Sequence, residues 1–258
     1  MIGISPLKRF EALRSVRQDV KPVDLSRVAV VIPALNEARN LSILLPCLHS
    51  IGVGQIVVGD NGSSDDTGSV IAANRAIRAL ESKRGYGAAC HAALLHLAKT
   101  VEVVVFVDAD LSVNVGGIPS LVEPILRDEC DFVLGARIPQ GRQPGSMSWP
   151  QRLANRLFPL LIRMGWGFHY EDMGPFRAIR CRSLQAMDMQ DRAFGWTIEM
   201  QIKAVELGLR IREIPVDYHK RKHGASKISS TLRGVVLAAY WITRTCAVLW
   251  WTRRRRMR

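Results

Sequence analysis

The chain has 258 residues, 48% of them hydrophobic, and its formal net charge at pH 7 is +13. This size and apolar content allow a sizeable core and predict a single domain, while the charge favours a polyanionic partner such as a nucleotide, a phospholipid surface or nucleic acid. The five scattered cysteines never form a CxxC pair, which argues against a disulfide framework and a zinc cluster.

The N-terminal residues 1–25 are basic and mixed in character. They lack the apolar run of about 7 to 15 residues that a secretory signal needs, so we expect a cytoplasmic protein. We divide the chain into this N-terminal extension, an α/β domain over residues 26–228, and a C-terminal helix with a basic tail over residues 229–258.

Three short apolar runs rich in β-branched residues predict buried parallel strands: residues 28–32, 55–59 and 103–107. Segments of helix length lie between them: residues 37–50, 65–80 and 86–99. This alternation predicts a mostly parallel sheet flanked by helices, with ligands at the carboxyl ends of the strands.

Polar motifs follow the first two predicted strands: PALNE at residues 33–37 and GDNGSSDDT at residues 59–67. Each opens a helix N-terminus, where backbone N–H groups favour anionic ligands, and Asp60 could hydrogen-bond a base or ribose. Ser63, Ser64 and Asp65 are also good cap residues, so ordinary turn chemistry explains each motif separately.

The third predicted strand ends in VDAD, which places Asp108 and Asp110 in alternation. Both side chains are therefore expected to face one crevice. Two hard oxygen donors suit Mg²⁺ or Mn²⁺, and such an ion would clamp a diphosphate. A pair of acids that only ends a strand and caps the next helix is the alternative interpretation.

Seven motifs then occur in a fixed order: VVIPALNE, GDNGSSDDT, KRGYGAA, FVDAD, GAR, DMGPFRA and RKHGASK. With this order and spacing the chain resembles the family 2 glycosyltransferases, in the branch of dolichyl-phosphate mannosyltransferase and the polyprenyl-phosphate glycosyltransferases. The resemblance implies a GT-A fold. It also implies metal-assisted, inverting transfer of a hexose from a UDP- or GDP-linked sugar to a polyprenyl or dolichyl phosphate.

The same resemblance implies roles for particular residues. Asp108 and Asp110 would hold the metal, while Ser112 stands where many relatives carry a Gln that faces it, so the metal's third protein contact stays open. The nucleoside site would be formed by Pro33, Ala34, Glu37 and Asp60, with Lys83 and Gly85 beside it.

Cations and acids further along complete the predicted site. Arg137, Arg152 and the RKHGASK element, with Arg221, Ser226 and Lys227, are expected to face a donor diphosphate or an acceptor phosphate. Asp172 and Glu199 are the remaining candidate acids. A hydroxyl acceptor would need one of them as a general base, whereas a phosphate acceptor would leave them to position other groups or to accept structural hydrogen bonds.

The C-terminal residues 235–251 are almost wholly apolar, with Arg244 near their centre and four arginines following at once. A membrane-spanning helix needs about 20 mainly apolar residues, so a single span is not expected. Arg233, Arg244 and Arg255 would share one stripe of a helix, which predicts a helix lying in the cytoplasmic membrane interface. Packing on the domain or on a second subunit, and a short or tilted span, are the alternatives.

Two other functions compete with transfer to a lipid phosphate. A family member with a hydroxyl acceptor on a glycolipid or small molecule would make Glu199 or Asp172 essential. A nucleic-acid-binding protein would use the positive charge directly, but the sequence has no zinc finger, RRM signature or regular base-reading helix, so we expect no nucleic-acid partner.

Overall fold

The computed structural model describes residues 23–138, 141–224 and 232–256. The N-terminal extension therefore lies almost wholly outside the described residues. Leu25, which the sequence assigned to that extension, is buried in the core, and its carbonyl accepts hydrogen bonds from the backbone of Val28 and Gly54. The folded domain thus begins slightly before residue 26.

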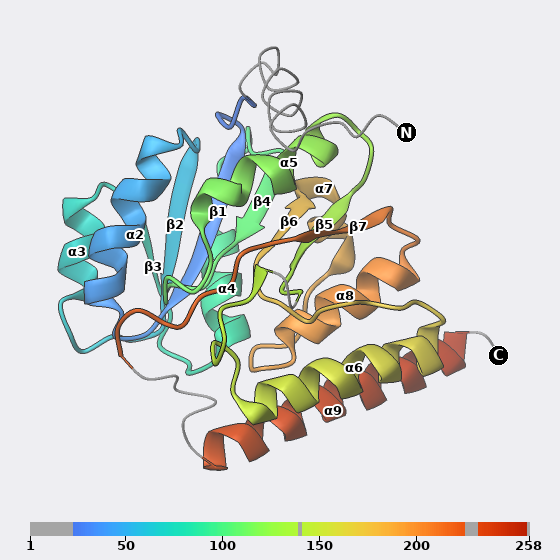
Figure 1. Cartoon of the computed structure of the whole chain (residues 1–258). Coiled ribbons are helices and arrows are strands. Elements are labelled where there is room, and N and C mark those ends of the chain that lie inside the picture. The colour runs from blue at the N-terminus through green and yellow to red at the C-terminus, as the bar shows by residue number, and fades with distance from the viewer. Residues whose placement is uncertain (1–22, 139–140, 225–231, 257–258) are drawn as a thin grey trace, which may run out of the picture.

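One sheet of seven strands runs through the molecule in the order β3-β2-β1-β4-β6-β5-β7 (Figure 1). The strands are β1 (Val28–Ala34), β2 (Gln55–Asp60), β3 (Ile77–Leu80), β4 (Val103–Phe106), β5 (Phe132–Ala136), β6 (Arg177–Arg180) and β7 (Ile211–Pro215). Neighbours pair in parallel except that β6 runs antiparallel to both β4 and β5. This confirms the predicted mostly parallel α/β sheet.

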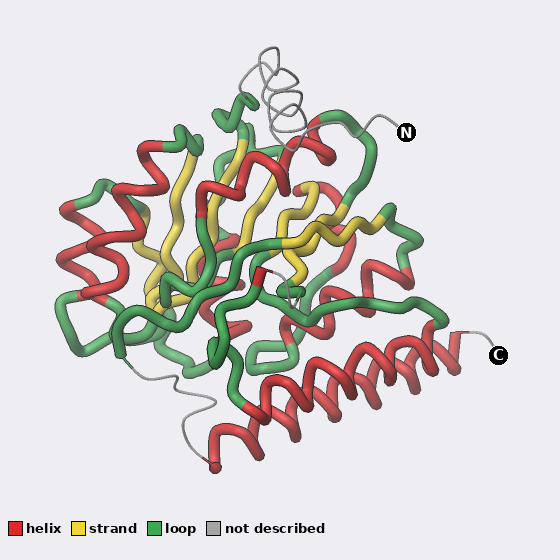
Figure 2. Tube along the Cα trace, in the orientation of Figure 1, coloured by secondary structure: helices red, strands yellow, loops and turns green. Residues whose placement is uncertain are grey.

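Helices cover both faces of the sheet, which Figure 2 shows as a central layer of strands. They are α2 (Ala38–Ser50), α3 (Thr67–Ala73), α4 (Tyr86–Leu94), the short 3-10 helix η1 (Val115–Gly117), α5 (Ile118–Leu126), α6 (Trp149–Trp166), α7 (Cys181–Met187), α8 (Trp196–Glu206) and α9 (Leu232–Arg256). Side chains of β1 alternate between the two cores: Val30 and Ile32 pack with α2 and α5, and Val31 packs with α4 and α8.

The helix expected over residues 65–80 is wrong in its second half. Helix α3 ends at Ala73, and residues 77–80 form the edge strand β3, parallel to β2. Arg75 has φ of 54°, a conformation that cannot continue a right-handed helix. The third predicted helix also ends early, at Leu94 rather than at residue 99.

Close packing of α4 on β2 positions the site. A Cβ on Gly59 would collide with the backbone carbonyl of Ala89, so only glycine allows the strand and helix to approach this closely. The buried face of α4 consists of small residues. The packing brings the first residues of α4 to the carboxyl ends of β1 and β4.

Candidate active site

A pocket of about 370 Å³ opens at the carboxyl ends of the central strands. Residues from the ends of β1, β2, β4 and β5 line it, together with the start of α4 and the segment that follows β7. Of the residues predicted from the sequence, the structure brings together Pro33, Ala34, Glu37, Gly85, Asp108, Asp110, Arg137 and Arg221.

The two polar motifs after β1 and β2 hold each other in place. The backbone amide of Asn36 donates to Ser63 Oγ over 2.9 Å, and the amide of Ser64 donates to Asn36 Oδ1 over 2.8 Å. Thr67 Oγ1 accepts from the amide of Glu37 over 3.0 Å. The side chains of GDNGSSDDT therefore fix the PALNE loop, and the N-cap of α3, Asp66, makes no side-chain cap bond.

Asp60 lies fully buried behind the pocket rather than in its lining. Its Oδ2 accepts from Arg78 Nε over 2.8 Å and Nη2 over 2.5 Å, and its Oδ1 accepts from the amide of Ser63. Burial acts to raise the pKa of Asp60, but these bonds more than offset it and keep the carboxylate charged. The sequence missed Arg78, which lies on β3 where a helix was expected.

Asn61, the next residue, does line the pocket and organises the KRGYGAA motif. Its Oδ1 accepts from the amide of Gly85 over 2.8 Å, and its Nδ2 donates to the carbonyl of Lys83 over 2.6 Å. Lys83 itself is exposed and outside the lining. Gly85 has no room for a Cβ, which would collide with the carbonyl of Arg192.

Asp108 and Asp110 follow β4, and each is partly exposed. Tyr86 Oη donates to Asp108 Oδ1 over 3.1 Å, while Asp110 Oδ1 accepts from the backbone amide of Ser112 over 3.0 Å. Burial, followed by repulsion from Asp110, raises the pKa of Asp108. A divalent cation would relieve this repulsion, so the pair fits the predicted metal.

The metal would have few other protein ligands. Within the described residues, no group of three or more His, Cys, Asp and Glu side chains is placed to hold a metal. Ser112 is buried, and its amide rather than its hydroxyl contacts Asp110. Water and ligand oxygens would therefore complete the coordination shell.

Three arginines add positive charge to the pocket lining: Arg84, Arg137 and Arg221. Arg221 Nη1 donates to Glu37 Oε1 over 2.9 Å, and its Nε lies 3.6 Å from Asp110 Oδ2. Arg137 stacks on the ring of Tyr218, with 5.0 Å between the guanidinium carbon and the ring centre. Of the three, Arg221 thus lies next to the carboxylate pair.

The two candidate bases lie outside the lining. The Asp172 carboxylate accepts from Arg137 through its backbone amide, Nε and Nη2, over 2.7 to 3.0 Å. Burial acts to raise the pKa of Asp172, and Arg137 more than offsets it. Glu199 accepts from the amides of Gln190 and Asp191, over 2.8 and 2.7 Å, and pairs with a lysine of its own helix. Both acids thus accept structural hydrogen bonds.

Three further predicted residues are not brought into the pocket. Arg152 is exposed on the first turn of α6 and does not line the pocket. Ser226 and Lys227 lie outside the described residues.

Sequence reasoning also missed several lining residues, among them Arg84, Tyr86, Gln151, Phe194 and Tyr218. Arg84 and Tyr86 stand inside the quoted motif KRGYGAA, so the motif itself was a usable signal. The others come from segments distant in the chain, and no local pattern marks them.

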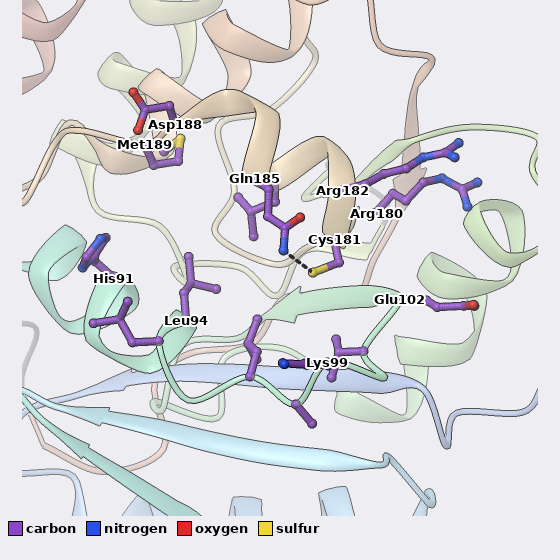
Figure 3. A pocket seen from close by; sticks show the side chains of 15 residues that line it. His91, Leu94, Lys99, Glu102, Arg180, Cys181, Arg182, Gln185, Asp188 and Met189 are labelled. Carbon is purple, nitrogen blue, oxygen red and sulfur yellow. Dashed lines mark hydrogen bonds between the residues drawn. The ribbon is translucent and has the colours of Figure 1, made fainter.

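A second hollow, of about 590 Å³ and drawn in Figure 3, lies at the opposite end of the central strands. Glu102, directly before β4, and Arg180, the last residue of β6, both line it. Figure 3 also shows His91 and Leu94 of α4 and Gln185 of α7, which line the same hollow. None of the residues predicted for the site lies there, so the smaller pocket is the candidate active site.

The chain is similar to known glycosyltransferases. The model of glycosyl transferase family 2 matches residues 29–187. An uncharacterized glycosyltransferase of Mycobacterium tuberculosis is 34% identical over 82% of this chain and 94% of its own length. The undecaprenyl-phosphate mannosyltransferase of Micrococcus luteus is 29% identical over 83% of this chain and 93% of its own.

A solved structure shares the fold. It is glucosyl-3-phosphoglycerate synthase from Mycobacterium tuberculosis in complex with Mn²⁺, UDP and glucosyl-3-phosphoglycerate. The TM-score is 0.67 at 20% identity, with coverage of 96% of this chain and 86% of that one.

Proposed function

The chain belongs to glycosyl transferase family 2, and from this premise we propose that it moves a hexose from a UDP- or GDP-linked sugar to a polyprenyl or dolichyl phosphate. Support comes from the relative that is an undecaprenyl-phosphate mannosyltransferase and from the solved neighbour that holds UDP and Mn²⁺. Family membership also favours an enzyme over the nucleic-acid-binding alternative.

On the donor side, the nucleoside would lie against the end of β1, where Pro33, Ala34 and Glu37 line the pocket. Asp60 would act indirectly, through the Ser63 loop that it holds, because its own carboxylate is buried and bonded. Mg²⁺ or Mn²⁺ held by Asp108 and Asp110 would neutralise charge on the donor diphosphate as the leaving group departs. With the metal bound to Asp110, Arg221 could leave that carboxylate and bond a phosphate oxygen of the donor instead.

The choice of a phosphate acceptor rests on one observation: the described lining residues supply cations but no carboxylate that remains available as a general base. Among the described lining residues the acids are Glu37, Asp108 and Asp110, and Glu37 already bonds Arg221 and Asn40. A hydroxyl acceptor needs a base to remove its proton, whereas a phosphate is an oxyanion and needs none. Arg137 and Arg84 supply the positive charge that a phosphate acceptor requires.

The proposed reaction is a direct displacement with inversion. An acceptor phosphate oxygen forms a bond to the anomeric carbon while the bond from that carbon to the diphosphate oxygen breaks. The nucleoside diphosphate leaves with the electron pair. In this scheme Asp172 keeps Arg137 oriented, and Glu199 supports the segment beside Gly85.

A panel of acceptors tests the proposal. Purified protein receives UDP- or GDP-linked hexoses with Mn²⁺ and one of three acceptors: a short-chain polyprenyl phosphate, the matching polyprenol, or 3-phosphoglycerate. We expect transfer to the polyprenyl phosphate alone. Transfer to the polyprenol would instead support the hydroxyl-acceptor alternative, and transfer to 3-phosphoglycerate would assign the chain the acceptor of its solved neighbour.

We also place the protein on the cytoplasmic face of a membrane, where lipid phosphates and soluble nucleotide sugars meet. The described helix from Gly234 to Arg255 is long and apolar enough to cross a membrane by length and composition, and 17% of its most apolar window is buried. The packing of this helix on the domain determines which of its side chains are free to contact lipid.

A further inference from the structure

Helix α6 exposes an apolar stripe along its whole length. Six large apolar side chains are between 40% and 76% exposed: Trp149, Leu153, Leu157, Leu160, Leu161 and Met164. Their spacing of three or four residues places them on one side of the helix. Phe158 and Ile162 are buried on the other side, so this stripe is not the one that packs on the domain.

Arginines border this stripe. Arg152, Arg156 and Arg163 are all exposed, and at about 100° per residue they fall between the buried side and the exposed apolar side. No acidic residue occurs in α6. An apolar stripe bordered only by positive charge is unusual for a surface in contact with water alone.

Helix α9 also exposes apolar side chains, but its exposed Arg244 lies among them, in one row with Tyr240 and Val248, instead of at their border. Val236, Leu237, Tyr240, Val248 and Trp251 are 44% to 60% exposed, while Thr245 and Cys246 are buried on the opposite side. The guanidinium carbons of Arg254 and Arg255 lie 3.8 and 3.6 Å from the ring centres of Trp250 and Trp251. This helix, too, contains no acidic residue.

The two helices form one outer layer. They run side by side in the same direction along one edge of the molecule (Figure 1), and both pack their inner sides on α8. Arg253 Nη1 donates to the carbonyl of Gly165 over 2.6 Å, which joins their C-terminal ends. Their exposed sides therefore point away from the domain together; we call this surface the α6/α9 face.

We infer that the α6/α9 face docks on an anionic lipid bilayer, with its apolar side chains in the acyl boundary and its arginines at the headgroups. Three arginines in α6 and six in α9, with no acidic residue in either helix, match a negatively charged surface. A second copy of the chain is a poor occupant, because it would bring these like charges together.

Crossing the bilayer would break contacts that α9 already makes. Thr245 Oγ1 donates to Asp191 Oδ2 over 2.8 Å, and the buried side of α9 would have to leave α8. A span would also place Arg244, which is exposed, within the hydrocarbon. Docking in the interface preserves all of these contacts.

The face borders the candidate active site. Gln151 of α6 lines the pocket, while Trp149 and Arg152 beside it are exposed at the same end of the helix. A docked protein would hold the pocket mouth near the headgroups. This last point rests on the proposed function, since it concerns a lipid-phosphate acceptor; the docking itself does not.

Vesicle flotation tests the docking without donor or acceptor. The full chain is mixed with vesicles of phosphatidylcholine alone or with phosphatidylglycerol added, at low and high salt. The test variant is Leu157→Gln with Met164→Gln. The matched control is Leu95→Gln with Leu207→Gln, which replaces two other apolar residues, 73% and 46% exposed, elsewhere on the surface.

We expect wild type and the control to float with anionic vesicles, and the test variant to bind about tenfold more weakly or worse with an unchanged unfolding temperature. Wild type should bind neutral vesicles less.

Equal binding by the test variant, or no preference for anionic vesicles, would overturn the inference. Resistance of wild type to alkaline extraction would indicate a span, and a dimer lost only in the test variant would indicate a second copy. Transfer to a soluble short-chain acceptor, measured separately, reports on the proposed function alone.

Discussion

At Asp108, the burial and repulsion that favour metal binding also lower the stability of the metal-free protein. Its pKa lies above the ordinary 3.8 because of burial and then the charge of Asp110. An acid with a raised folded-state pKa binds more protons in the folded than in the unfolded protein. The stability of the metal-free protein therefore falls as pH rises from about 4 through the raised pKa.

The first prediction concerns Asp110→Asn. Removing the neighbouring charge lowers the pKa of Asp108, and each unit recovered is worth about 1.4 kcal/mol. We expect the metal-free variant to be about 1 kcal/mol more stable than wild type at pH 8, with the gain vanishing near pH 4. It should also lose Mn²⁺-dependent binding of nucleoside diphosphate. Urea unfolding with chelator and Mn²⁺ titration measure the two effects, and unchanged Mn²⁺ affinity would refute the metal assignment.

The second prediction separates support from catalysis at Glu199. Its carboxylate accepts two backbone amides and pairs with Lys203. Glu199→Gln should lower the free energy of unfolding by about 1.5 to 3 kcal/mol, because a charge-assisted acceptor is lost in a buried place. Turnover per folded molecule should change less than tenfold, with the same pH profile. A loss of several hundredfold at full stability would make Glu199 a base.

At the scale of elements, the segment from residue 190 to 195 connects three helices. Asp191 accepts from Thr245 of α9, and its amide donates to Glu199 of α8. The carbonyls of Arg192 and Ala193 accept from the amides of Ala88 and Gly87 in α4. Helix α9 is therefore attached to the same segment that supports the first turn of α4, beside the pocket.

The third prediction follows from this attachment. Removing residues from 228 onward would uncover the sides of α6 and α8 that now contact α9. We expect a marked fall in soluble yield and in unfolding temperature, measured by fractionation and calorimetry. A control that keeps the helix, Tyr240→Gln with Val248→Gln, should retain wild-type stability since both side chains are exposed. A soluble, fully stable truncation would show that α9 is an appendage.

At the scale of the whole molecule, we assign two neighbouring but distinct surfaces to the two partners, the nucleotide and the lipid. The carboxyl ends of β1, β2 and β4 carry the candidate active site, while α6 and α9 carry an apolar, basic face. Nucleotide binding and lipid docking should therefore be separable.

The fourth prediction is a thermal-shift measurement with UDP- and GDP-sugars. A ligand that binds only the folded state at 100 times its Kd adds about 2.7 kcal/mol, which corresponds to a shift of about 5 to 10 °C in a chain of this size. One donor with Mn²⁺ should give this shift, and chelator should abolish most of it. The α6 variant Leu157→Gln with Met164→Gln should respond like wild type. No response to any nucleotide sugar would contradict the proposed donor.

The sequence alone determined the parallel α/β sheet, because buried strands and their helices leave local patterns of apolar residues. The sequence also identified the family, because the ordered set of motifs is a property of the chain alone. It singled out Asp108 and Asp110 because two acids alternate at the end of a predicted strand. It failed at β3, an edge strand that is mostly exposed and has no buried apolar run like that of β4, and with β3 it missed Arg78.

Only the tertiary structure decided which charged groups remain available. Asp60, Asp172 and Glu199 were also candidates in the sequence, yet folding bonds Asp60 to Arg78, Asp172 to Arg137, and Glu199 to backbone amides of the preceding loop. Helix α6 is a second case, because its apolar residues look alike in the sequence and only the packing on α8 leaves one side of the helix exposed. Burial and partner choice depend on contacts between distant segments, and no local pattern encodes them.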